Sequence, residues 1–288
     1  EGGCVMESVP VQSTISAQEY FAIEAVNQSL LKEVLRSPSH ASSYLGHTKK
    51  ATNAMQLGTA VHSTLLNADN FDNEVIVQPD INRRTKDGKV EYEKFLAKSK
   101  GKAVITREQA VHCMHIANSI SRSREAMSLI GYADTEQSFL WKDETTALTC
   151  KARIDAIHPE DKKVVDLKTT ADASPHGFAR SVMKFGYHIQ AAFYLRAASG
   201  LTRGIDAIKD GWQFYIVAIE TSQPYAVACY KLDQRAIIEG DKMIDKALTL
   251  WAEATLLDEY SGYPDVITTL SLPEWALTED LGNKGESL

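Results

Sequence analysis

Two aspartates and a lysine have the types and spacing that cleavage of a phosphodiester bond requires. Asp155 precedes Asp166 by eleven residues, and Lys168 lies two positions after Asp166. Side chains alternate between the faces of a strand, so Asp166 and Lys168 point the same way. The turn-forming segment His158–Lys162 predicts a hairpin that brings Asp155 beside Asp166. Two carboxylates suit Mg²⁺, and an ammonium group orients water and neutralises phosphate, so the pattern indicates metal-assisted hydrolysis. The alternative is an ordinary hairpin with a solvated, charged face.

Two helical pairs extend this pattern. Gly58 and His62 lie four residues apart in an apolar stretch, and so do Gln190 and Tyr194 in another. Residues four apart share one face of a helix. Glycine permits close approach to a neighbouring element, and histidine is a good third ligand for a divalent metal. Gln190 and Tyr194 offer an amide and a hydroxyl that can reach a phosphate or brace the lysine. The alternatives are a core histidine and a half-exposed helix face.

Taken in order, these motifs resemble the PD-(D/E)xK nuclease superfamily, in its RecB-like branch, and more closely the C-terminal nuclease domain of RecE-type exonucleases (exonuclease VIII). The pattern is a GxxxH helix, an aspartate strand, a DLK strand and a QxxxY helix. The resemblance covers about residues 25 to 275. The segments that carry it are Asn27–Lys32, Ser37–His40, Leu57–His62, Ile81–Thr85, Asp166–Thr170 and Gln190–Tyr194.

The resemblance implies the roles of individual residues. His62, Asp155 and Asp166 become metal ligands, the Leu167 backbone carbonyl completes the shell, and Lys168 is the catalytic lysine. The expected metal is Mg²⁺, with Mn²⁺ as a substitute.

Three accessory residues follow from the same resemblance. Gln190 and Tyr194 match its accessory motif and are expected to take part in catalysis. Glu136 matches an acidic residue that often precedes the core strands, and is a weaker candidate ligand. Pairing with a basic side chain is the other interpretation of Glu136.

The resemblance also implies an activity. RecE-like enzymes, encoded by phages or prophages, digest one strand of duplex DNA from its 5′ end. They leave 3′ single-stranded tails for recombination by an annealing protein of the RecT type, and they assemble as a ring, expected here as a homotetramer. The alternatives are a structure-selective or site-specific endonuclease of the same fold, or a catalytically dead DNA-binding module. A complete set of four catalytic residues argues against the dead module.

Hydrophobic periodicity predicts the elements that must position these residues. The predicted fold is α/β: a central mixed β-sheet flanked by helices, with an N-terminal helical elaboration and the metal site at one edge of the sheet. Strands are expected at 73–78, 133–142, 148–157, 162–169, 211–219 and 225–231. Helices are expected at 27–47 with a break at Ser37-Pro38, and at 53–67, 88–99, 106–130, 174–199 and 233–258.

Composition sets the remaining expectations. With 288 residues, 44% of them hydrophobic and 24% charged, the chain suits one large domain. We expect a disordered or cloning-derived segment at 1–24, a single nuclease domain at 25–275 and a loose tail at 276–288. No run of about 18 apolar residues and no signal peptide is present, so a cytoplasmic protein without membrane contact is expected.

Cysteine usage and net charge refine this description. The four cysteines form no CxxC pair, which argues against zinc, an iron–sulfur cluster and a disulfide framework. The net charge is −7, and basic residues occur only in patches such as Arg83-Arg84 and Arg122 with Arg124. An acidic chain with local basic patches fits a ring that slides on DNA better than a tight, static DNA binder.

Overall fold

The computed structural model of the chain describes residues 11–13, 15–47 and 51–272. A six-stranded sheet forms its centre, in the order β1-β4-β5-β6-β7-β8. Only β6 and β7 pair in parallel, and the other neighbours are antiparallel. The strands are β1 (Val11–Ser13), β4 (Asp134–Lys142), β5 (Thr149–His158), β6 (Lys163–Thr170), β7 (Gln213–Glu220) and β8 (Val227–Lys231). A separate parallel pair consists of β2 (Val75–Val77) and β3 (Ala103–Ile105).

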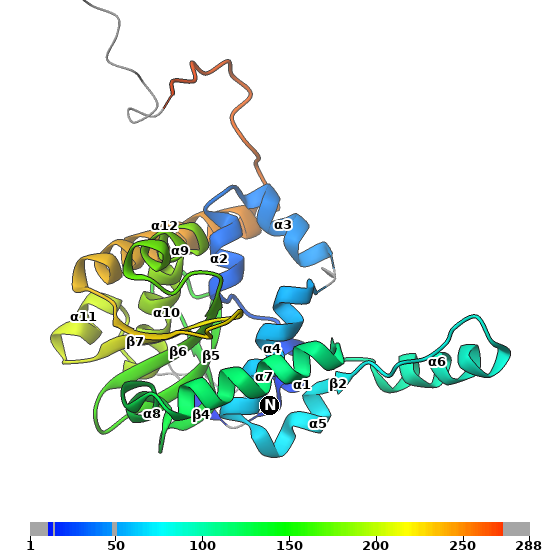
Figure 1. Cartoon of the computed structure of the whole chain (residues 1–288). Coiled ribbons are helices and arrows are strands. Elements are labelled where there is room, and N and C mark those ends of the chain that lie inside the picture. The colour runs from blue at the N-terminus through cyan, green and yellow to red at the C-terminus, as the bar shows by residue number, and fades with distance from the viewer. Residues whose placement is uncertain (1–10, 14, 48–50, 273–288) are drawn as a thin grey trace, which may run out of the picture.

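Helices cover both faces of the sheet (Figure 1). They are α1 (Ala17–Ala22), α2 (Gln28–Val34), α3 (Pro38–Gly46), α4 (Asn53–Leu66), α5 (Phe71–Glu74), α6 (Lys86–Lys98), α7 (Arg107–Ser121), α8 (Arg124–Ile130), α9 (Pro175–Phe185), α10 (Tyr187–Ser199), α11 (Gly204–Lys209) and α12 (Gln234–Leu257), with a 3₁₀ turn at Ala68–Asn70. The mixed sheet between helical layers agrees with the α/β prediction. None of the described helices is long and apolar enough to cross a membrane.

Alternation along the strands divides the core in two. On β6, Val164 faces the core shared with α10 and α12, whereas Val165 and Leu167 face the core shared with α4 and α7. This is the period-2 pattern of a strand that is buried on both faces. It places Asp166 and Lys168 on the same face of β6, as the sequence predicts. That face is on the α10 side, and α4 approaches the sheet from the opposite side.

Three features differ from the predicted elements. The helix expected over 106–130 is two helices, because Ser123 adopts an extended backbone and its hydroxyl caps α8 by accepting from the Ala126 amide. The short helix α11 and the strand β3 carry no clear periodic signal.

The third difference concerns residues 1–24. Within this segment β1 pairs with β4, and α1 begins with a capping box between Ser16 and Glu19, so residues 11–13 and 15–24 belong to the fold. The remaining expected terminal residues, 1–10 and 276–288, lie outside the described residues.

Candidate active site

The site forms where two central strands separate. β5 pairs with β6 only from Ala156 to His158, opposite Lys163 to Val165. At its other end β5 is flanked instead by Val26, which bridges to Cys150. The prediction of a metal site at one edge of the sheet is therefore wrong. Because β5 and β6 stop pairing after three residues, the sheet opens between these two central strands. Asp155 and Asp166 follow the last paired residues and are neighbours there.

Side chains replace the missing strand pairing around Leu167. Its backbone N–H donates to Asp155 Oδ2 over 2.8 Å, and its carbonyl accepts from His62 Nε2 over 2.8 Å. A carbonyl oxygen can only accept, so His62 carries a proton on Nε2. The other ring nitrogen, Nδ1, lies 3.6 Å from Asp155 Oδ1. The predicted histidine thus reaches the predicted aspartate, and the role of the Leu167 carbonyl as a ligand stays a prediction.

Glu136 completes a group of possible ligands with His62 and Asp155. One donor atom from each of these three side chains lies within 4.8 Å of the others. Glu136 has a positive φ of 53° and interrupts the pairing between β4 and β5. Its carboxylate also accepts from Arg153 Nε over 2.6 Å. Both interpretations of Glu136 therefore hold geometrically: it pairs with a basic side chain, and it faces the other candidate ligands.

The electrostatics of this group favour a cation. Burial, reinforced by the charge of Asp166, raises the pKa of Asp155 even though His62 opposes the shift. Burial and the charge of Asp155 likewise raise the pKa of Glu136 against the effect of Arg153. Two carboxylates that crowd one another in this way suit a hard divalent cation. An imidazole that donates through Nε2 to a carbonyl leaves the lone pair of Nδ1 for the same ion.

Asp166 and Lys168 form a second group on the α10 side. Lys168 Nζ lies 2.5 Å from Asp166 Oδ2, and Gln190 Nε2 donates to Asp166 Oδ1 over 2.6 Å. Burial opposes the charge of Lys168, but Asp166 and Asp155 outweigh it and raise the lysine's pKa. The lysine therefore carries a proton throughout the neutral range. The side chain of Asp166 is almost fully buried, at 1% exposure.

Tyr194 supports this group from one turn further along α10. Burial and the charges of Asp166 and Asp155 hold the pKa of its phenol well above the ordinary value, although a hydrogen bond with Gln190 opposes the shift. Tyr194 is therefore a neutral, buried hydroxyl that fixes the amide of Gln190. The QxxxY pair braces Asp166 beside the lysine, whereas the predicted roles were to brace the lysine itself or to reach a phosphate.

Two residues of the site were missed by sequence reasoning. Tyr187, at the start of α10, places its ring 4.9 Å from Lys168 Nζ and 6.0 Å from Lys32 Nζ. Burial and the nearby Lys168 lower the pKa of Lys32 to about 8. Gly186 makes this contact possible with a left-handed φ of 64°, and a Cβ there would stand 3.2 Å from Lys32 Cε. Lys32 belongs to the segment Asn27–Lys32, which carried the resemblance but no assigned role.

The basic segments predicted for DNA lie elsewhere. Arg83 and Arg84 precede α6, which projects from the body as an arm (Figure 1). Arg122 and Arg124 lie where α7 meets α8. The structure does not bring either segment into contact with the candidate ligands.

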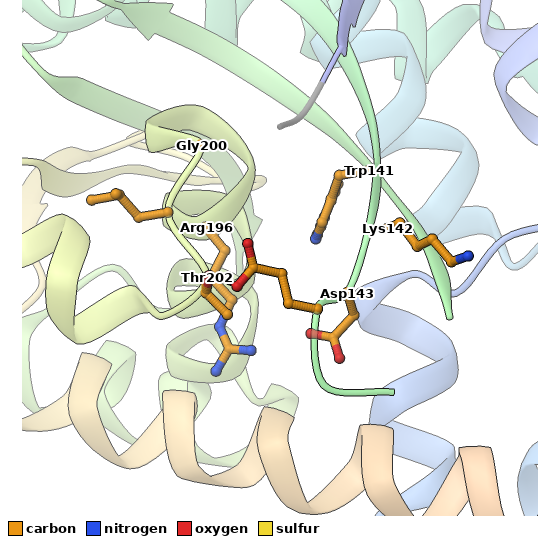
Figure 2. A pocket seen from close by; sticks show the side chains of 8 residues that line it. Trp141, Lys142, Asp143, Arg196, Gly200 and Thr202 are labelled. Carbon is orange, nitrogen blue, oxygen red and sulfur yellow. Dashed lines mark hydrogen bonds between the residues drawn. The ribbon is translucent and has the colours of Figure 1, made fainter. Parts of the chain in front are cut away.

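One defined cavity also lies outside the site (Figure 2). Trp141, Asp143, Arg196 and Thr202 are among the residues that line it, and its volume of about 10 Å³ admits roughly one water molecule. It is too small for a nucleotide.

Comparison with known proteins places the fold. Residues 27–260 match a family model described as a PDDEXK-like domain of unknown function (DUF3799). A crystal structure from Eubacterium rectale, titled "Putative exonuclease", aligns over 93% of this chain and 100% of its own, with 13% identity and a TM-score of 0.61. A crystal structure of SSO0001 aligns over 82% of this chain and 88% of its own, with 18% identity and a TM-score of 0.31. No curated protein matches. The predicted nuclease fold is confirmed.

Proposed function

We propose that this chain, which belongs to the family of PDDEXK-like domains of unknown function (DUF3799), is a divalent-metal-dependent deoxyribonuclease. The observation that carries the proposal is the convergence of His62, Glu136 and Asp155 beside the ion pair of Asp166 with Lys168. Proteins of this fold generally depend on a divalent metal. The donor set here contains carboxylate oxygens and one imidazole, which suits Mg²⁺ or Mn²⁺.

The residues divide the hydrolysis between them. His62, Asp155 and Glu136 would hold the cation, with Asp166 next to them as a further ligand. When bound, that cation supplies Lewis-acid polarisation of the phosphodiester. Lys168, kept protonated by the two aspartates, orients the attacking water and neutralises charge that develops on the phosphate. Gln190 and Tyr194 hold Asp166 in place.

The finer proposal is a 5′-to-3′ exonuclease on duplex DNA in the cytoplasm. Its product would be a 3′ single-stranded tail for an annealing protein of the RecT type. Support comes from the ordered RecE-like motifs and from the similar fold of the E. rectale protein, which is described as a "putative exonuclease". We further propose a homotetrameric ring, because a chain of net charge −7 needs retention on DNA by topology more than by a tight grip.

A plasmid assay tests the activity and its alternatives together. Linear and covalently closed duplexes are incubated with the protein and Mg²⁺, with EDTA as control. Digestion of the linear form alone is the expected result. Cleavage of both forms would indicate an endonuclease, and a gel shift without cleavage would indicate a DNA-binding module. Activity that persists in EDTA would contradict the metal mechanism.

Two measurements address direction and assembly. Release of label from the 5′ end before the 3′ end supports the proposed polarity, and the reverse order contradicts it. Light scattering across a concentration series is expected to give the mass of four chains of 31.8 kDa. A monomer that degrades long duplexes without dissociating would remove the argument for a ring.

A further inference from the structure

The exposed face of α9 is a row of basic side chains. His176, Arg180 and Lys184 follow one another at four-residue intervals, and all three are exposed. Residues at this spacing share a helix face and are separated by about 6 Å along its axis. The helix contains no acidic residue. Within the described part of the chain, no ion pair joins Arg180 or Lys184 to a carboxylate. The nearest carboxylate in sequence, Asp172, accepts from the Ser174 backbone. Hydrogen bonds from Ser174 lower the pKa of Asp172, and the charges of Arg180 and His176 add to this shift, so Asp172 compensates part of the row without forming an ion pair.

Apolar side chains continue this row at the C-terminal end of α9. Met183 is 71% exposed and Phe185 is 49% exposed. The Phe185 ring stacks on Tyr187 with the centroids 5.7 Å apart, and Lys184 Nζ lies 5.3 Å from the Phe185 centroid. A large aromatic ring that is half exposed beside a cation provides a platform for stacking.

The row leads directly into the active site. Tyr187, which stacks on Phe185, also lies beside Lys168, so a single ring separates Phe185 from the proposed catalytic lysine. Lys32 approaches the same ring from α2. No carboxylate forms an ion pair with Lys32 among the described residues, and Lys32 is desolvated next to Lys168. The charge of Asp166 offsets only part of this effect, since the pKa of Lys32 stays lowered, and a phosphate group would supply further negative charge.

We propose that this face binds a single-stranded segment of DNA next to the bond that is cut. The basic row (His176, Arg180, Lys184) and Lys32 contact phosphates, and Phe185 with Met183 receives the face of a base. Stacking requires an exposed base face, which the interior of a duplex does not offer, whereas an unpaired strand does. The inference rests on the proposed nuclease function, because the active site is what brings a strand to this place.

Fluorescence anisotropy of a labelled 12-nucleotide oligothymidylate measures the binding directly. EDTA in the buffer prevents cleavage. Phe185→Ala is expected to weaken binding by roughly 5- to 150-fold, the range for loss of one stacked base. The double variant Arg180→Ser with Lys184→Ser should reduce the slope of log K against log salt by about 1.4, since each phosphate contact contributes about 0.7 for a single strand.

Matched controls separate stacking from general damage. Phe185→Trp should retain the affinity, because tryptophan also stacks. Tyr132→Ala removes a fully exposed aromatic side chain at the turn between α8 and β4, and should leave binding unchanged. All the substituted side chains are exposed or half exposed, so melting temperatures close to the parent are expected for every variant.

The outcomes distinguish this surface from the nuclease proposal itself. The proposed single-strand surface would be contradicted if Phe185→Ala and the double variant bound the oligonucleotide as tightly as the parent. It would also be contradicted if the parent bound only duplex DNA. Hydrolysis of bis(4-nitrophenyl) phosphate by the parent with Mn²⁺ tests the active centre on a substrate without any flanking nucleotide. If that hydrolysis is absent in a folded protein while the oligonucleotide still binds, the nuclease proposal fails and the surface stands.

Discussion

The two ends of α10 each bury a charged network, and the two networks are organised in opposite ways. Near its C-terminus, Arg196 donates to Asp241 Oδ1 through Nε at 2.8 Å and through the terminal nitrogen at 2.6 Å. That terminal nitrogen also reaches Asp245 Oδ1 at 2.7 Å. The backbone N–H of Gly204 donates to Asp241 as well. Near the N-terminus, Gln190 faces the group of Asp155, Asp166 and Lys168.

The difference lies in how completely charge is compensated. Around Arg196 each buried charge has an opposite partner, and the small adjoining cavity holds nothing larger than water (Figure 2). At the other end, the pKa values of Asp155 and Glu136 are raised and that of Lys32 is lowered, so these groups hold their charges at a cost. The network around Arg196, in which every buried charge is paired, holds the fold together. The groups at the other end lack full charge compensation, and they mark the place where a cation and a phosphate would bind. One helix thus supports a structural network at one end and the proposed active site at the other.

The largest expected effect is a loss of activity when the proposed active site at the N-terminal end of α10 is altered. Asp155→Asn and Lys168→Ala should each lower the rate of DNA hydrolysis by roughly a thousandfold or more, because each removes charge that acts on the transition state. Initial rates on a labelled linear duplex measure this. A folded Asp155→Asn protein with more than a tenth of the parent rate would exclude Asp155 from catalysis.

The largest loss of stability is expected when the paired network around Arg196 is broken. Arg196→Met leaves Asp241 buried without its principal partner, which typically costs about 3–5 kcal/mol of unfolding free energy. Urea denaturation measures the loss. The fraction that remains folded should hydrolyse DNA at close to the parent rate. A large fall in specific activity with unchanged stability would mean that the two networks are not separate.

Intermediate losses are expected from the residues that hold Asp166. Gln190→Ala and Tyr194→Phe should reduce turnover by roughly ten- to a thousandfold, the scale of one oriented hydrogen bond to a charged group. Steady-state kinetics on the same duplex provide the measurement. If both variants turned over DNA at the parent rate, Gln190 and Tyr194 would have only a structural role.

The smallest effect is a dependence of metal-free stability on pH. Asp155 and Glu136 have folded-state pKa values above their ordinary values of 3.8 and 4.5, so the folded protein binds more protons in that window. Stability in EDTA should therefore fall as pH rises from about those ordinary values towards the raised ones. Asp155→Asn should recover part of this loss at neutral pH, because it removes the buried negative charge. Mg²⁺ should stabilise the parent more than this variant, and equal shifts in melting temperature would contradict the assignment.

Local pattern was sufficient for most of the fold and for the strands and helices that carry the predicted site residues. Period-2 alternation identified the strands that carry Asp155 and Asp166, and four-residue spacing placed His62 and Gln190 on helices. The structure brings all of these residues to one place. The spacing of a DxK segment is a property of a single strand, so it can be recognised without any knowledge of the partners.

Contacts between distant segments could not be predicted in this way. The opening of the sheet at its middle depends on Val26 bridging to Cys150. The contact of the Tyr187 ring with both Lys32 and Lys168 depends on how α2 packs on α10. Lys151 donates to the carbonyls of Tyr20 and Ile23, more than 120 positions away. No periodicity in either segment encodes such a pairing, so the N-terminal residues were assigned to a disordered terminus.

The attachment of residues 11–13 and 15–26 has a consequence for how the chain is made. This stretch is synthesised more than a hundred residues before β4 and β5, which supply its partners: Val26 bridges to Cys150, and Arg153 donates to the Ile15 carbonyl over 2.8 Å. Its ordering must therefore wait until the central strands have left the ribosome, and such long-range closure is slow. The native contacts of these residues with Lys151 and Arg153 can therefore form only after the chain has been synthesised through β5.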